Sequence, residues 1–137
     1  MAKRSFHGER ILLVEDNTRL LRSMAFLLNI LGFEVMTACD GADGLSALRS
    51  RTPDLIIADI EMPRLDGYEF LRSIRADKRW SCIPFIFSSE KYSLHDLTYA
   101  LDLGANDYLP KPFDIHDVLD VIARTLPPSM ERLRKIV

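Results

Sequence analysis

Short apolar runs alternate along the chain with longer segments of helical periodicity. The runs are ILLV at 11–14, EVMTA at 34–38, LIIA at 55–58, FIF at 85–87 and DYL at 107–109. A strand with one wet face alternates apolar and polar residues, whereas a strand covered on both faces does not. The runs therefore predict five strands of a parallel sheet that is buried between helices.

The segments between the runs have the spacing of amphipathic helices. In the first segment, five apolar side chains fall on one helical stripe: Leu20, Met24, Leu27, Leu28 and Leu31. Four similar stretches cover about 42–51, 68–76, 94–103 and 115–126, with proline or glycine at their ends. Strict alternation with right-handed crossovers predicts an α/β fold, a doubly wound sandwich of three layers.

Length and composition indicate one domain without a membrane segment. The 137 residues are 47% hydrophobic and 28% charged, and we expect a domain over 9–126, an extension at 1–8 and a tail at 127–137. The longest apolar stretch, 24–33, is interrupted by Asn29 and is shorter than the roughly 20 residues that span a bilayer. No apolar region follows the basic N-terminus, so we expect a cytoplasmic protein.

Charge and cysteine content argue against binding to nucleic acid or membrane and against metal or redox chemistry at cysteine. A net charge of −2 provides no general attraction to nucleic acid or to an anionic membrane, and we expect binding to neither. Cys39 and Cys82 form no metal or redox motif, so we expect buried thiols without a partner. The histidines are scattered, and we assign them no chemistry.

Polar residues follow four of the five predicted strands. They are Glu15 and Asp16 after the first, Asp59 after the third, Ser88, Ser89 and Glu90 after the fourth, and Lys111 with Pro112 after the fifth. The carboxyl ends of parallel strands share one edge, and strand order 2-1-3-4-5 makes these four strands contiguous. The sequence therefore predicts one polar pocket at that edge.

The predicted pocket needs a positive charge. Carboxylates about 5 Å apart repel by roughly 3 kcal/mol per pair at an effective dielectric constant near 20. Oxygen ligands without His or Cys favour Mg²⁺, Lys111 adds a second cation, and Ser89 adds a hydroxyl group. Such a set suits phosphoryl transfer onto a carboxylate.

Four motifs in their order along the chain carry a family resemblance. ILLVEDN, DLIIADIEMPRLDG, IPFIFSS and YLPKPF resemble the motifs of the receiver domain of bacterial two-component response regulators, the CheY-like family, over about 9–126. The resemblance implies the flavodoxin-like fold and a signalling switch instead of a turnover enzyme. Slow intrinsic phosphorylation and dephosphorylation are expected.

The resemblance also implies a phosphoacceptor and a metal site. Asp59 would accept phosphoryl from a phosphohistidine of a sensor histidine kinase or a phosphotransfer protein. Asp16 would bind Mg²⁺ directly, Glu15 mainly through a metal-bound water, and Glu61 through its backbone carbonyl group. Asp16 has an alternative role as a helix N-cap, although Asn17 or Thr18 would serve equally well.

Further implied roles concern the response to phosphorylation. Lys111 would pair with the phosphoryl oxygens, Ser89 would turn inward to bind phosphate, and Tyr108 would move from exposed to buried. The bond from Lys111 to Pro112 is expected to be cis. Ser88 is a rival for the Ser89 role, but its side chain would point to the opposite face, and Tyr108 has an alternative role as a core residue.

The output of the switch is expected to be binding. The face formed by the fourth helix, fifth strand and fifth helix, with Tyr99, Tyr108 and Asp117 as candidates, would meet a downstream protein or a second copy.

Three residues near the entrance are expected to modulate access. Glu90 stands where the family usually has a small residue, and we expect it to slow small phosphodonors. Glu61 and Lys91 would shield the aspartyl phosphate from water if they paired. An unchanged phosphate lifetime in Lys91→Ala would contradict that expectation.

Two other classes of protein are less compatible with the motifs. A haloacid-dehalogenase-like phosphatase would use Asp59 as nucleophile and Glu61 as acid, but such enzymes carry the motif on the first strand. A flavodoxin-like FMN binder would need a phosphate loop where VEDNTRL would repel phosphate. A receiver that binds partners without phosphorylation is a further alternative.

Overall fold

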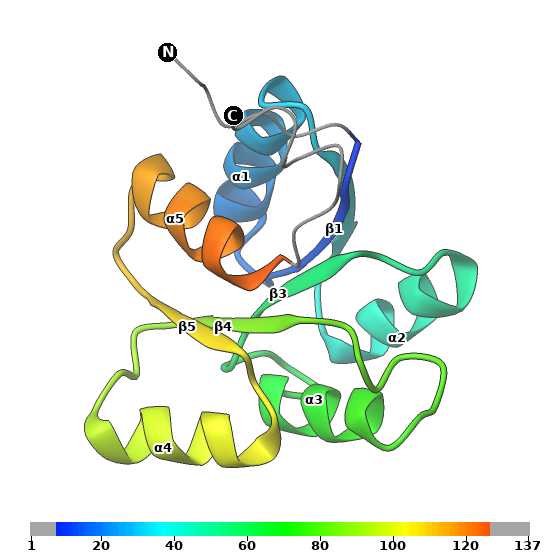
Figure 1. The fold of residues 1–137 in the computed structure, drawn as a ribbon, viewed down its shortest axis with the longest axis vertical. Helices are drawn as coiled ribbons and strands as arrows, with labels where there is room; N and C mark the ends of the chain where they lie inside the picture. The colour runs from blue at the N-terminus through cyan, green and yellow to red at the C-terminus, as the bar shows by residue number, and fades with distance from the viewer. Residues whose placement is uncertain (1–7, 127–137) are drawn as a thin grey trace.

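A computed structural model describes residues 8–126 and confirms the predicted alternation of strands and helices (Figure 1). The elements are β1 Arg10–Val14, α1 Thr18–Ile30, β2 Glu34–Ala38, α2 Gly41–Ser50, β3 Leu55–Asp59, α3 Gly67–Arg75, β4 Phe85–Ser89, α4 Leu94–Leu103, β5 Asp107–Pro110 and α5 Ile115–Thr125. The predicted extension at 1–8, apart from Gly8, and the predicted tail at 127–137 lie outside the described residues.

The five strands form one parallel sheet in the predicted order β2-β1-β3-β4-β5. Helices α1 and α5 cover one face, and α2, α3 and α4 cover the other (Figure 1). The sandwich therefore has three layers, and the carboxyl ends of all strands lie at one edge of the sheet.

Each face of the sheet has its own hydrophobic core. Ile57 and Ile86 pack with α1 and α5, whereas Ile56, Phe85 and Phe87 pack with α2, α3 and α4. Side chains alternate along a strand, so a strand with both sets must be apolar at every position. This explains the continuous apolar runs of β3 and β4, which are buried throughout.

Edge strand β2 departs from this pattern. Its first three residues are only partly buried, and Thr37 is exposed. Cys39 follows this strand, is exposed and donates from Sγ to an Asp43 carboxylate oxygen at 3.1 Å. Cys82, in the loop before β4, is also exposed. The prediction of buried thiols was therefore wrong, because one cysteine follows a partly covered strand and the other lies in a loop.

A side-chain cap begins each helix of the part of the chain that the structure describes. The caps are Asn17, Asp40, Asp66, Ser93 and Asp114, each of which accepts a hydrogen bond from a backbone N–H in the first turn. Among residues 8–126, no helix has the length and apolar character needed to cross a membrane.

Candidate functional site

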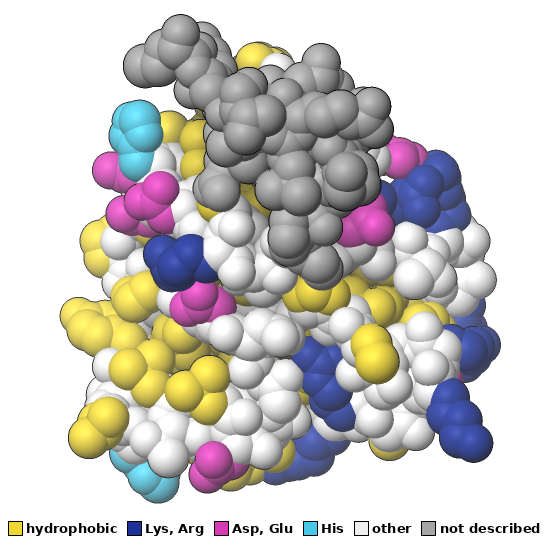
Figure 2. All heavy atoms as spheres, in the orientation of Figure 1, with side chains coloured by type: hydrophobic (Ala, Val, Ile, Leu, Met, Phe, Trp, Pro, Cys, Tyr) yellow, Lys and Arg dark blue, Asp and Glu magenta, His cyan; other side chains and the backbone are white. Residues whose placement is uncertain are grey.

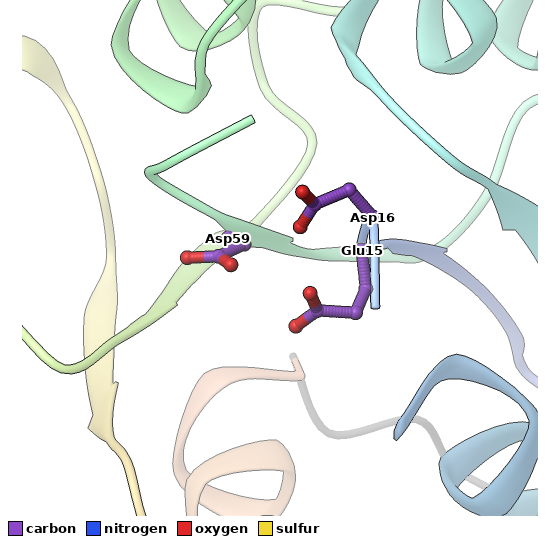
Figure 3. Close-up of side chains that lie close together, drawn as sticks. All are labelled: Glu15, Asp16 and Asp59. Carbon is purple, nitrogen blue, oxygen red and sulfur yellow. The ribbon is translucent and has the colours of Figure 1, made fainter. Parts of the chain in front are cut away.

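Three carboxylates meet at the carboxyl edge of the sheet, as the strand-end pattern predicted. Glu15 and Asp16 follow β1, and Asp59 is the last residue of β3; each offers an oxygen within 4.8 Å of the others. Figure 3 shows the three carboxylate groups gathered around one place. Glu15 and Asp59 are buried, whereas Asp16 is exposed. Acids that are distant in the chain are therefore neighbours in the fold.

The local backbone holds these acids in place. The Glu15 N–H donates to the carbonyl of Ala38 at 3.0 Å, which continues the β1–β2 ladder past the end of β1. After Asp59 the chain turns tightly: a Cβ added at Gly67 would lie 2.3 Å from the Asp59 carbonyl oxygen and 2.7 Å from the Ile60 Cα. A residue without a side chain is therefore required at position 67.

Lys111 brings a positive charge into the acidic cluster. Its Nζ donates to Glu15 Oε1 at 2.7 Å and to Asp59 Oδ2 at 3.1 Å, and its side chain is only 15% exposed. The peptide bond to Pro112 is cis, as expected. One ammonium group thus links two of the three carboxylates.

Burial and the contacts within the cluster shift the pKa values of Glu15 and Lys111. Burial raises the pKa of Glu15, and the Asp59 carboxylate adds to that rise, while hydrogen bonds from Lys111 and the Asn17 N–H oppose it. Burial lowers the pKa of Lys111, but its hydrogen bond with Glu15 and the Asp59 charge raise it by more, so the net shift is upward. The lysine is therefore held in its charged form.

Asp16 is available for the site because another residue caps the following helix. The Asn17 side chain accepts from the Leu20 N–H at 3.2 Å, and the Asn17 N–H donates to Glu15 Oε2 at 3.0 Å. The alternative role of Asp16 as the N-cap of α1 is therefore not what the structure shows. The sequence left this choice open, because Asp, Asn and Thr all cap helices.

The two serines at the end of β4 have different surroundings. Ser89 is fully buried, and its Oγ accepts from the Lys91 N–H at 3.0 Å. Ser88 is also buried, and its Oγ has no hydrogen-bond partner within the described chain. Ser88 and Ser89 point to opposite faces of the sheet, as strand alternation predicted.

Tyr108 lies on the same side of the sheet as Ser89. We expected it to begin exposed, but the ring is 8% exposed and packs 6.4 Å from the Phe87 ring, centroid to centroid. The exposed arrangement is not the one in this structure. Burial raises the pKa of the Tyr108 hydroxyl to about 12, and a weaker interaction with the Ser89 side chain opposes that rise.

A pocket of about 360 Å³ opens over the acidic cluster. Its lining combines the three clustered acids with Asn17, Glu61, Glu90 and Lys111. Glu61, Glu90 and Lys91 are exposed, and the Glu61 N–H donates to Asp59 Oδ1 at 3.3 Å. No ion pair joins Glu61 to Lys91 among the residues described, so the pairing on which the shielding would depend is not formed here.

One ion pair near the site, between the buried carboxylate of Asp40 and the exposed side chain of Arg64, was not predicted. Asp40 accepts from the Asp43 N–H at 2.8 Å and from the Arg64 Nε at 2.8 Å, which joins the start of α2 to the β3–α3 loop. Arg64 has a positive φ of 67°. A signal was present in the sequence, because Asp40 precedes GADG and suits an N-cap, but its arginine partner is 24 residues away.

The residues at this edge fit a divalent cation. The donor set contains only oxygens, two of its three carboxylates are buried, and one lysine does not balance their charge. Oxygen donors of this kind are the ligands that Mg²⁺ takes in proteins. The parallel sheet covered by helices on both faces places the chain among the doubly wound α/β proteins. Proteins of this class bind their ligands at the carboxyl edge of the sheet, where the acidic cluster lies.

Comparison with known proteins identifies the family. Residues 11–123 match the response regulator receiver domain, so the chain belongs to the receiver domains of two-component response regulators, a family that is phosphorylated on an aspartate. It is 33% identical over 120 residues to Protein PilG of Pseudomonas aeruginosa, covering 88% of this chain and 89% of that protein. It is also 36% identical to Response regulator MprA of Mycobacterium avium, covering 80% of this chain and 47% of MprA.

Solved structures agree with this assignment. The chemotaxis response regulator CheY4 of Vibrio cholerae superposes with a TM-score of 0.83 at 28% identity, covering 87% of this chain and 99% of CheY4.

Some relatives are longer than this chain. A probable transcriptional regulator ycf27 of Porphyridium aerugineum is 35% identical, but this chain spans only 42% of its length. The chain therefore corresponds to the receiver part of such longer relatives.

Proposed function

We propose that Asp59 accepts a phosphoryl group from a phosphohistidine and that this modification switches a binding surface. The observation that carries the proposal is the convergence of Glu15, Asp16, Asp59 and Lys111 at one edge of the sheet, inside a polar pocket. In the proposed transfer, an Asp59 carboxylate oxygen attacks phosphorus and the bond from phosphorus to the histidine nitrogen breaks. That nitrogen keeps the electron pair and takes up a proton.

The site residues would have different roles in balancing the charge of the phosphoryl group. Glu15, Asp16 and Asp59, with the Glu61 carbonyl oxygen, would hold Mg²⁺, which supplies positive charge near the transferred phosphoryl oxygens. Lys111 is already within hydrogen-bond distance of Asp59, so its ammonium group has only a short way to move to a phosphoryl oxygen. Ser89 would donate its hydroxyl proton to the phosphoryl group.

Lys111 acts as a counter-charge before phosphorylation. Its ammonium group neutralises part of the repulsion between Glu15 and Asp59, which would otherwise destabilise the domain. A divalent cation competes for the same carboxylate oxygens. We infer that cation binding loosens the Lys111 contacts and prepares the lysine to meet the phosphoryl group.

Aromatic contacts connect the site to the proposed output surface. The Phe87 ring, one residue before Ser88, packs against Tyr108 and lies 5.4 Å from the Tyr68 ring, and Tyr68 lies 4.8 Å from Tyr99. A shift of Ser89 toward phosphate would open space beside Tyr108 and change the packing of Tyr99.

The proposed output surface is exposed and partly apolar. Leu94, Leu101 and Tyr99 are exposed on α4, and Figure 2 shows hydrophobic side chains gathered beside this helix. Asp117 at the start of α5 is exposed. This α4-β5-α5 face would bind a downstream protein or a second copy, with no direct contact to nucleic acid or membrane.

The phosphodonor would approach from the neighbouring side of the site. A second pocket of about 470 Å³ shares Glu90 and Lys111 with the acidic pocket and adds Leu20, Pro112 and Phe113. The apolar residues of this second pocket lie next to the charged residues of the acidic pocket. This combination suits a helix that carries a phosphohistidine, as in a sensor histidine kinase or phosphotransfer protein. We propose that the exchange takes place in the cytoplasm.

Intact-mass measurement tests this function. The protein is incubated with acetyl phosphate and Mg²⁺, and the mass and association state are followed over time, with Asp59→Ala as the control. The wild type is expected to gain one phosphoryl group and lose it slowly, while the variant gains none. Incorporation in Asp59→Ala, or no incorporation in the wild type, would refute the proposal. Rapid turnover of many phosphorylated molecules would favour a phosphatase instead.

A further inference from the structure

Ser88 is a buried hydroxyl to which the proposed function assigns no role. Its side chain is 4% exposed, and its Oγ has no hydrogen-bond partner within residues 8–126. A buried polar group without a partner destabilises the folded state, because it loses its hydrogen bonds to water. The positions before it on β4 are Phe85, Ile86 and Phe87, which are fully buried. A hydroxyl in this apolar strand therefore needs an explanation.

Strand register places Ser88 beside the phosphoacceptor. Ser88 is the register partner of Asp59 on β3 and of Leu109 on β5. Since side chains alternate along strands, Ser88 shares a face with Ile86, and Asp59 shares the same face with Ile57. Ser88 and Asp59 are thus neighbours on the α1–α5 side of the sheet.

Lys111 has to cross β4 on that same face. The Lys111 N–H donates to the Ser89 carbonyl at 2.8 Å, which continues β5 alongside β4 and sets Lys111 beside Glu90. Its Nζ contacts Asp59 on β3 and Glu15 beyond β1. Because β4 lies between β5 and β3, the lysine stem passes over the end of β4. The β4 side chain at the level of Asp59 on this face is Ser88.

We propose that Ser88 is a positioning residue for Lys111. Its small side chain leaves room for the lysine stem, and its hydroxyl oxygen accepts an N–H when the ammonium group leaves a carboxylate. An ammonium group has three donors, and Glu15 and Asp59 use two of them. The role of Lys111 in phosphoryl transfer rests on the proposed function.

Three substitutions separate the size of Ser88 from its hydroxyl group. Ser88→Thr and Ser88→Val have nearly the same shape but differ in a hydroxyl against a methyl group, while Ser88→Ala only removes the hydroxyl. We expect the rate of phosphorylation by acetyl phosphate at saturating Mg²⁺ to fall about threefold to tenfold in Ser88→Ala. It should fall furthest in Ser88→Val, with Ser88→Thr at least about threefold faster than Ser88→Val.

A double-mutant cycle with Lys111→Met shows whether Ser88 acts through the lysine. This substitution removes the ammonium group and keeps a stem, so the difference between Ser88→Thr and Ser88→Val should disappear in its background. Affinity for beryllofluoride should follow the same order as the rates. Ser73→Ala, on α3 away from the site, is the matched control and should behave as wild type.

Equal rates for the Thr and Val variants would overturn the inference, and so would an unchanged Thr–Val difference in the Lys111→Met background. The same cycle in urea unfolding requires no phosphorylation. Additive shifts of the unfolding midpoint for Ser88→Ala and Lys111→Met would also count against contact between the two side chains. If the wild type takes up no phosphoryl group, the proposed function fails, and the unfolding cycle still decides the relation of Ser88 to Lys111.

Discussion

Asp40 and Asp59 are both buried aspartates at the carboxyl edge of the sheet, yet their surroundings differ. The charge of the Asp40 carboxylate is balanced by Arg64, and its oxygens accept hydrogen bonds from the Asp43 N–H and from Arg64. Asp59 lies beside Glu15 and Asp16 and shares one ammonium group with Glu15. The difference teaches that a balanced carboxylate stabilises the fold, whereas an unbalanced group of carboxylates retains capacity for a cation.

The largest expected effect is the loss of phosphoryl incorporation. Asp59→Asn keeps the side-chain shape but removes the nucleophile, and we expect no mass gain after incubation with acetyl phosphate and Mg²⁺. Asp40→Asn should be phosphorylated as the wild type is, provided that circular dichroism shows a folded protein. A folded Asp40→Asn variant that takes up no phosphate would break the comparison.

The next effect is on stability. Asp40→Ala removes an N-cap and a charged hydrogen-bonded pair, and we expect it to lower the free energy of unfolding by about 2–3 kcal/mol. Asp59→Ala relieves repulsion and should change stability by less than about 1 kcal/mol. Urea unfolding in the presence of EDTA measures both. Equal losses in the two variants would show that Asp59 is as structural as Asp40.

The gain in folding stability on Mg²⁺ binding should depend on Asp59 and not on Asp40. At ten times its dissociation constant, a cation that binds only the folded state stabilises it by about 1.4 kcal/mol. We expect this gain in the wild type and in Asp40→Asn, and no gain in Asp59→Asn or Asp16→Asn. Removal of Mg²⁺ with EDTA should reverse it, and a gain in Asp59→Asn of the same size would place the cation elsewhere.

Access to Asp59 provides a smaller test. Glu90 is exposed and lines both pockets at the site, so its charge and size should hinder anionic donors. Phosphorylation by acetyl phosphate should be roughly two- to fivefold faster in Glu90→Ala. Glu90→Gln separates charge from size, and added salt should reduce the part due to charge. Equal rates in all three proteins would exclude this role.

The smallest effect is a difference in pH dependence. The Asp43 N–H and Arg64 lower the pKa of Asp40 below its ordinary value of 3.8, so its stabilisation is present above that value and is lost as pH falls through the folded pKa. Burial raises the pKa of Glu15 above 4.5, so its contribution is full below that value and is lost as pH rises through the folded pKa.

Urea unfolding between pH 3 and 7 without Mg²⁺ checks these two directions. The gap in stability between wild type and Asp40→Asn should narrow as pH falls toward 3. Glu15→Gln should remove part of the wild-type loss of stability as pH rises above 4.5. Curves that stay parallel to the wild type would mean that neither carboxylate changes its pKa on folding.

Much of the site was predictable from the sequence, because its residues lie at or directly after the carboxyl ends of the strands. Asp59 ends an apolar run, and Lys111 follows the last one, so the topology of a parallel sheet brings them together whatever the side chains do locally. The choice between Asp16 and Asn17 as the α1 cap was not predictable, since both types cap helices and only backbone geometry decides. The exposure of Cys39 depended on how little of β2 the helices cover.

The sequence by itself determined the order of the elements, the parallel sheet and the set of polar residues at its edge, because hydrophobic period and turn residues act locally. Only the tertiary structure decided which of these groups touch. Lys111 meets Glu15 across 96 positions of chain, Asp40 pairs with Arg64, and Ser88 is the register partner of Asp59 on the neighbouring strand. Such contacts depend on register and side-chain reach between strands, which no local pattern encodes.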